Sequence, residues 1–353
     1  MKPEGETRRL RQLILDRALP ASGTAQIADN LPRPAGVFFG REAEQAQLHQ
    51  RLVDPHYRLI TIVGAGGMGK TRLAIEVGRQ VKASFPDGVW LGPLDAAQGS
   101  AEPIKIAIGE AAGLGQAGQQ LTGEQVLAIL RDKQTLLILD NCEGALSELA
   151  FIPEWLRRAP HLAILATSRE PLNFQAESVV ALAGLPTGEA EMRAAEALFA
   201  ERGRMARADF VVSAGNLPQV RRICDLVGGS PLGIALAAAW LRRRSLAQIG
   251  EEIGRSLDFL STSLRDVDPR QRSMRAVFET SWQLLTPPEQ DVFAALATFP
   301  ATFTAAAAGQ VAGATLADLD LLGEKSLLQQ QPEPERYVMH LSLIHISEPT
   351  RPY

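Results

Sequence analysis

Leu59 to Thr71 reads L-I-T-I-V-G-A-G-G-M-G-K-T, and this stretch decides the fold. Its first five residues are apolar or β-branched, which is typical of a buried strand. After the glycines, the chain continues from Arg72 with the apolar spacing of a helix. A glycine-rich loop therefore joins a strand to the amino terminus of a helix, where unpaired backbone N–H groups and the helix dipole favour an anion.

The loop fills every fixed position of the P-loop pattern G-x-x-x-x-G-K-[ST]. Its glycines permit positive φ and close approach to phosphate oxygens, the lysine adds positive charge, and the threonine hydroxyl can ligate Mg²⁺. The alternative, an ordinary glycine-rich turn followed by an exposed lysine, is disfavoured by the flanking strand and helix. We expect ATP or ADP to bind at Gly64, Ala65, Gly66, Gly67, Met68, Gly69, Lys70, Thr71 and Arg72.

The composition is that of a globular protein. Of 353 residues, 46% are hydrophobic and 22% are charged, and this length predicts two or three domains. The formal net charge of −4 gives the whole chain no electrostatic attraction to nucleic acid, so no nucleic-acid partner is expected. Cys142 and Cys224 lie far apart without metal-ligand neighbours, which favours a reduced, cytoplasmic protein. The chain shows no signal region and no apolar run that could span a bilayer, so no membrane partner is expected.

Four strands are expected after the P-loop strand. Gly88–Leu91 would close a βαβ unit with parallel pairing. Three more apolar runs follow, at Thr135–Asp140, His161–Arg169 and Ser178–Leu182. Together they predict an α/β P-loop NTPase domain over 35–186, with a doubly wound, mainly parallel five-stranded sheet. Ligands of such sheets lie at the carboxyl ends of the strands, where Gly64, Asp140 and Arg169 stand.

The remaining segments predict further domains. Residues 1–34 favour an amphipathic helix and a linker. Apolar spacing over 187–262 predicts a helical domain. A second set of helices over 263–340 ends in two strand-like pieces, which suggests a winged-helix domain.

Polar residues at two strand ends complete the expected site. Asp140 follows an apolar strand, where a P-loop protein needs a carboxylate for the water shell of Mg²⁺ beside Thr71, although a helix-capping aspartate is the alternative. Arg169 offers a fork for a γ-phosphate, against the alternative of a solvated loop arginine. Asn141 can orient water but cannot take its proton, so hydrolysis should be slow unless Glu143 acts as the base.

Six ordered motifs resemble the signal-transduction ATPases with numerous domains (STAND), the group that includes the NB-ARC ATPases. The motifs are Gly40-Arg41-Glu42-x-Glu44, the P-loop, L-I-L-D, A-T-S-R, G-G-S-P-L-G-I-A-L-A-A-A and Tyr337-Val338-Met339-His340. The pattern is similar to bacterial regulators in which this ATPase accompanies DNA-binding or adenylate cyclase modules and tandem helical repeats. Effector or sensor modules would then lie outside this chain.

The resemblance implies roles for single residues. Gly40 and Arg41 would lie near the adenine, and Pro231 with its neighbour Leu232 would pack on it. The arginine of A-T-S-R would sense the γ-phosphate, and His340 would reach the β-phosphate of ADP. The resemblance also implies a switch, in which ADP holds the winged-helix domain against the nucleotide-binding domain and ATP releases it for self-association.

Residues 341–353 depart from the pattern. They contain L-S-L-I-H-I-S-E-P-T-R, which looks like a translated sequencing adapter, so we expect a non-native tail after a truncated gene fragment. Two other functions stay open. A P-loop enzyme such as a small-molecule kinase or motor ATPase would need a further positioned base. A DNA-binding regulator would use Arg270, Arg272 and Arg275, although a solvated or interdomain face is favoured for them.

Overall fold

A computed structural model describes residues 27–33, 36–94, 100–114, 121–187, 193–262, 272–299, 302–332 and 335–339. The amino-terminal helix expected before residue 27, His340 and the tail expected at 341–353 lie outside these residues. Within the described residues, every helix falls short of the length and apolarity that crossing a lipid bilayer requires.

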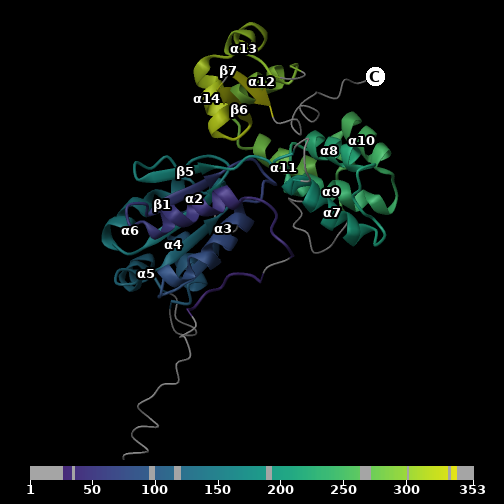
Figure 1. Ribbon diagram of the computed structural model, residues 1–353. Helices are drawn as coiled ribbons and strands as arrows, with labels where there is room; N and C mark the ends of the chain where they lie inside the picture. The colour runs from purple at the N-terminus through teal and green to yellow at the C-terminus, as the bar shows by residue number, and fades with distance from the viewer. Residues whose placement is uncertain are drawn as a thin grey trace, which may run out of the picture.

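Five parallel strands form one sheet in the order β2-β3-β4-β1-β5 (Figure 1), which confirms the predicted fold class. The strands are β1 Leu59–Val63, β2 Val89–Pro93, β3 Leu136–Asp140, β4 Ala163–Ser168 and β5 Glu177–Ala181. The expectation that β2 pairs with the P-loop strand is wrong, because β3 and β4 lie between them. β1, β3 and β4 are buried at every residue and take the centre, whereas β2 is partly exposed and takes an edge.

Helices cover both faces of the sheet. They are α2 Glu42–Val53, α3 Lys70–Gln80, α4 Ala101–Ala111, α5 Gly123–Leu130 and α6 Ile152–Arg158. Alternate strand residues enter two cores, so that Ile138 packs with α2 and α3 while Leu137 packs with α4, α5 and α6. The sequence did not predict α6, because its seven residues give too short a periodic pattern.

Residues 27–33 lie along the edge of β2. Asp29 forms a parallel bridge with Val89, and the Asn30 side chain donates to the Leu91 carbonyl at 2.9 Å and accepts from its N–H at 2.6 Å. This part of the predicted linker therefore runs along the sheet, because the edge strand offers backbone groups that need partners.

A helical bundle follows the sheet. It consists of α7 Ala194–Ala206, α8 Leu217–Leu226, α9 Pro231–Ala239 and α10 Leu246–Arg255, which enclose one apolar core. Proline at the first position of α9 and the Ser230 side chain, which accepts from the Gly233 N–H, explain why that helix begins where it does.

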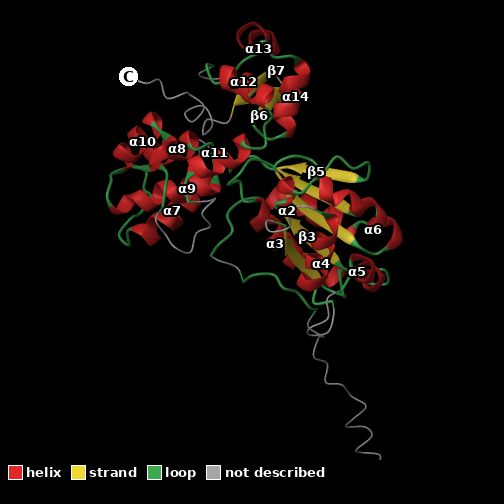
Figure 2. Cartoon of the chain, turned by 180° about the vertical axis from the view of Figure 1, so that it is seen from behind, coloured by secondary structure: helices red, strands yellow, loops and turns green. Residues whose placement is uncertain are grey.

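A helix–hairpin unit completes the described chain. It contains α11 Met274–Trp282, α12 Pro287–Leu296, α13 Ala305–Ala312, α14 Leu316–Glu324 and the antiparallel strands β6 Leu328–Pro332 and β7 Glu335–Met339. Helices followed by a hairpin are the order expected of a winged helix, which stays a prediction. Figures 1 and 2 show α11 at the junction of the sheet, the bundle and this unit.

Candidate functional site

The P-loop glycines meet two different requirements. Gly67 and Gly69 have φ of 78° and 87°, the left-handed region that favours glycine. Gly64 and Gly66 have φ outside this region, and for them close approach of other parts of the chain is the requirement. A Cβ at Gly64 would lie 2.5 Å from the Leu182 carbonyl oxygen, and one at Gly66 would lie 2.4 Å from a side chain of α11. At these two positions glycine is needed because other parts of the chain pack closely on the loop.

Lys70 is buried, so the alternative of an exposed lysine after a turn is wrong. Its Nζ donates to the carbonyl oxygens of Gly64 at 2.7 Å and Ala65 at 3.1 Å, and the residue is 8% exposed. Burial lowers the pKa of Lys70 to about 8, while the charge of Glu143 raises it and that of Arg169 lowers it. An ammonium group that is poorly hydrated and contacts neutral carbonyls is well suited to receive an anion.

Nucleotide affinity should therefore fall as the pH rises above about 8. Bound phosphates stabilise the ammonium form, so the pKa of Lys70 is higher in the complex than in the free protein. Between these two pKa values, nucleotide binding must therefore be accompanied by the uptake of a proton. The fall should approach about tenfold per pH unit, measured by titration with a fluorescent ADP. Lys70→Arg stays charged and should give a flat profile. An equal fall in that variant would contradict the assignment.

Asp140 is held by two hydroxyl groups. Its Oδ1 accepts from Thr71 Oγ1 at 2.6 Å and from Thr167 Oγ1 at 2.5 Å, and the residue is 7% exposed. The two residues expected beside Mg²⁺ are thus in contact, and a hydroxyl with a carboxylate is the oxygen donor set that Mg²⁺ accepts. Sequence reasoning gave no role to Thr167, because a threonine in an apolar strand reads as a β-branched core residue.

Arg169 faces α11 rather than solvent. Its Nε donates to Glu143 Oε1 at 3.0 Å, and its Nη1 donates to the Val277 carbonyl at 3.1 Å and to the Ser281 hydroxyl. The Ser326 hydroxyl donates to the Arg169 carbonyl at 2.7 Å. Arg169 is 9% exposed, so the alternative of a solvated loop arginine is wrong. Sequence reasoning did not indicate the partners from α11.

Asn141 and Glu143, which follow β3, differ in the hydrogen bonds that their atoms make. Asn141 adopts a left-handed backbone, with φ 60° and ψ 52°, and its N–H donates to Thr167 Oγ1 at 3.1 Å. Glu143 has a buried Oε2 without a hydrogen-bond partner in the described part of the chain. Its charge acts on Lys70 more strongly than the charge of Asp140 does, so Glu143 lies near the phosphate loop. Its Oε2 is the atom here that could accept a proton from water.

A small pocket of about 40 Å³ is lined by Arg41 and Pro231, two of the four residues expected around an adenine. Its lining contains Val37, Phe38, Phe39, Arg41, Met68, Gly69, Arg72, Leu185, Leu198 and Pro231. Leu232, the next residue of α9, donates its N–H to the Gly67 carbonyl at 3.3 Å, which ties the bundle to the P-loop. The structure therefore brings Arg41 and Pro231 to one pocket, with Leu232 beside the P-loop, and adenine binding there stays a prediction.

Two arginines hold the wall of this pocket. Arg41 follows Gly40 in a left-handed turn, donates to the Ala183 carbonyl at 2.5 Å and pairs with Glu44 at 2.8 Å. Arg72 donates to the carbonyl oxygens of residues 36 and 37, at 2.9 and 2.7 Å, and its guanidinium lies 5.3 Å from the centre of the Phe38 ring. These contacts give Arg72 a role in holding the pocket, and its contact with the nucleotide stays a prediction.

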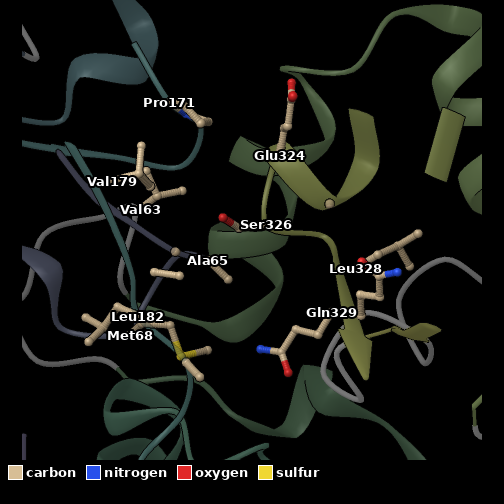
Figure 3. Close-up of a pocket in the computed structure, with 15 residues that line it drawn as sticks. Val63, Ala65, Met68, Pro171, Val179, Leu182, Glu324, Ser326, Leu328 and Gln329 are labelled. Carbon is tan, nitrogen blue, oxygen red and sulfur yellow. The ribbon is translucent and has the colours of Figure 1, made fainter. Parts of the chain in front are cut away.

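A larger cavity of about 420 Å³ lies over the carboxyl ends of β1 and β5. Figure 3 shows Val63, Val179 and Leu182 on its sheet side and Ser326 and Gln329 on the side of the helix–hairpin unit. The helix–hairpin unit thus faces the P-loop across this cavity. Beside the cavity, α11 and Ser326 of the unit contact Arg169 directly.

Comparison with known proteins gives one match to a family and several to relatives. Residues 41–170 match the NB-ARC domain family. A putative HTH-type transcriptional regulator of Mycobacterium tuberculosis is 33% identical over 280 residues, 77% of this chain and 31% of that protein. An uncharacterized protein of that species is 31% identical over 267 residues, 75% of this chain and 66% of that protein. This chain thus spans about a third of the regulator's length.

A solved structure adds evidence on the fold. The ORC2 protein of Aeropyrum pernix, solved in ADPNP–ADP complexes, covers 90% of this chain and 94% of its own, with a TM-score of 0.51 at 14% identity. The family match extends from Arg41 past Arg169 and so includes the buried lysine and the carboxylate described above. This chain therefore contains an NB-ARC domain, the P-loop ATPase domain of the STAND group, and the buried lysine and the carboxylate lie within it.

Proposed function

We propose that this protein is a regulatory switch that binds ADP or ATP with Mg²⁺, and in which ATP releases the helix–hairpin unit and permits self-association. The transcriptional regulator among its relatives supports a role in transcription or signalling. One observation carries the proposal. The arginine at the end of β4 is held by α11, a helix of the unit that would have to move.

Each part of the nucleotide would have its own partner. Lys70 and the N–H groups of the loop would bind the phosphates, and Thr71 with Asp140 would hold Mg²⁺, which screens the phosphate charge. Pro231 and the small pocket beside it would receive the adenine. His340, which the resemblance assigns to the β-phosphate of ADP, lies outside the described residues.

In the proposed switch, α11 keeps Arg169 from turning fully towards a γ-phosphate, although the Nη2 of this arginine would lie only 3.2 Å from a Cβ at Gly66 of the P-loop. Its Nη1 is bonded to two neutral acceptors, the Val277 carbonyl and the Ser281 hydroxyl. A phosphate oxygen is charged, and charge-assisted hydrogen bonds are about twice as strong as neutral ones. ATP would therefore draw Arg169 away from α11, whereas ADP lacks the γ-phosphate and would leave the contact in place.

Movement of α11 would affect all three parts of the molecule. Met274 packs in the core of the helical bundle, and Phe278 packs in the core of the helix–hairpin unit. Between them, Val277 lies so close to Gly66 that the P-loop has room only for glycine. A change at Arg169 would thus be passed to both neighbouring cores through one helix.

Hydrolysis would be slow in this arrangement. Glu143 would act as the base, because Asn141 cannot take a proton. However, Arg169 Nε donates to Oε1 of Glu143 at 3.0 Å, so the arginine holds this carboxylate in place. ATPase activity would then depend on the same release of Arg169 that follows ATP binding.

Direct DNA binding through Arg270, Arg272 and Arg275 is not favoured. Arg275 pairs with Asp258 at 2.7 Å and with Glu279 at 3.3 Å, both in its own chain. These contacts support an interdomain role for Arg275. Arg270 lies outside the described residues.

Ser281→Ala should raise the affinity for ATP relative to ADP by about tenfold. The change removes one of the two bonds by which α11 holds Arg169, so less free energy is needed to release the arginine. Titration of the nucleotide-free protein with ATP and with ADP measures the ratio.

Thr280→Ala is the matched control. Its hydroxyl lies on the same helix but donates to the Ala276 carbonyl at 2.9 Å, so its loss should leave the ratio unchanged. An unchanged ratio in Ser281→Ala, or the same change in both variants, would count against Arg169 as the element that couples nucleotide to opening.

A further inference from the structure

We propose that Thr167 is a positioning residue, which holds the Asp140 carboxylate for Mg²⁺ and so sets how strongly Mg²⁺ supports nucleotide binding. The proposal rests on the function proposed above and assigns a role to a residue outside the nucleotide-contacting set. Thr167 lies on β4 and is 0% exposed. Its hydroxyl contacts Asp140, the last residue of β3, and Asn141, the residue after it.

The direction of these hydrogen bonds is fixed by their chemistry. The Asp140 carboxylate accepts, so the single hydroxyl hydrogen of Thr167 is donated to its Oδ1, at 2.5 Å. The lone pairs of the same hydroxyl accept the N–H of Asn141, at 3.1 Å. One hydroxyl therefore holds both the carboxylate and the left-handed backbone that follows it.

Strand register places Thr167 for this task. β3 and β4 are parallel and pair Leu139 with Ala166, so Thr167 and Asp140 follow side by side at the carboxyl edge. Thr71, at the start of α3, donates to the same Oδ1 at 2.6 Å. Two hydroxyls from different elements thus fix one carboxylate oxygen.

A fixed carboxylate matters for Mg²⁺ because this ion demands nearly ideal octahedral geometry at short distances. Residues that orient the groups around a metal contribute about tenfold to a hundredfold in its affinity. Without the hydroxyl of Thr167, the Asp140 Oδ1 would lose one of its donors and the carboxylate would gain freedom to rotate. The expected loss is in the contribution of Mg²⁺, while contacts between the loop and the phosphates remain.

Two other buried threonines show that a threonine can pack in this sheet without a hydrogen bond from its hydroxyl. Thr61 on β1 and Thr135 before β3 are both 0% exposed, and their hydroxyls have no partner among the residues that the structure describes. There the β-branched shape suffices, and valine has the same shape. Thr61→Val is therefore a matched control for Thr167→Val within the same sheet.

The test measures the affinity for a non-hydrolysable ATP analogue, once with Mg²⁺ and once with EDTA, together with the melting temperature. Thr167→Val should lose about tenfold in affinity with Mg²⁺ and stay within about twofold of the wild type in EDTA. Thr167→Ser keeps the hydroxyl and should restore the affinity. Thr61→Val should match the wild type in both conditions. If Thr167→Val does not fold, Thr167→Ala also lacks the hydroxyl and takes its place with the same expected loss.

Three results would overturn the proposal: an equal loss in EDTA, no loss in either condition, or a failure of Thr167→Ser to restore the affinity. These outcomes differ from a failure of the proposed function, in which the wild-type protein itself would bind no nucleotide. A fourth result, a wild-type affinity that does not depend on Mg²⁺, would also overturn the role of Thr167 and, with it, the part of the proposed function that concerns Mg²⁺.

Discussion

Lys70→Ala should weaken the binding of both ADP and ATP by on the order of 100-fold. Lys70 is the buried cation of the P-loop, and its Nζ already lies within 3.1 Å of two loop carbonyls, where phosphate would arrive. Both nucleotides carry the phosphates that it would contact, so both should lose affinity, as isothermal titration can measure.

The fold should survive this change, because removal of a buried ammonium also removes its desolvation penalty. The melting temperature without nucleotide should stay within a few degrees of that of the wild type, and added ADP should no longer raise it. Lys105→Ala is the control, since this lysine pairs with Glu102 at 3.5 Å on α4. Unchanged affinity for both nucleotides in Lys70→Ala would remove the phosphate-binding role.

Gly184→Ala should lower the free energy of unfolding by about 3 kcal/mol. A Cβ at this position would lie 1.9 Å from the Gly228 carbonyl oxygen, which is backbone and cannot rotate away. Next to it, the Leu185 N–H donates to the Gly229 carbonyl at 2.8 Å, so the chain that leaves the sheet is hydrogen-bonded to the turn before α9. Urea denaturation should show the loss.

Gly254→Ala provides the comparison for this effect. Gly254 lies in α10 with nothing within 4 Å of its added Cβ, so alanine should stabilise that helix by about 0.5–1 kcal/mol. If the two variants had equal stability, the close backbone crossing at Gly184 would not be the reason for glycine there.

The sequence predicted the parts of the fold that depend on neighbouring residues. β1 was predicted with its observed bounds, because a strand buried on both faces is a continuous apolar run bounded by a glycine-rich loop. The site was predicted for the same reason, since the P-loop, Asp140 and Arg169 each follow an apolar strand. Parallel strands bring their ends to one edge of a sheet.

Contacts between distant residues could not be predicted in this way. Arg169 and Val277 are 108 positions apart, and nothing local to A-T-S-R indicates that α11 would hold its guanidinium. The position of β2 was wrongly predicted for a similar reason. Its place at the sheet edge depends on how deeply each of the five strands is buried, which is not a local property. The burial of Lys70 could not be predicted from the local sequence pattern either.

Identification by mass of the nucleotide released from the purified wild-type protein tests the central claim most directly. In the proposed switch, the contact between α11 and Arg169 belongs to the state without a γ-phosphate, so we expect ADP, in an amount near one per chain, and none in Lys70→Ala. A wild-type protein that releases no adenine nucleotide, and that binds neither ADP nor ATP in titration, would contradict it.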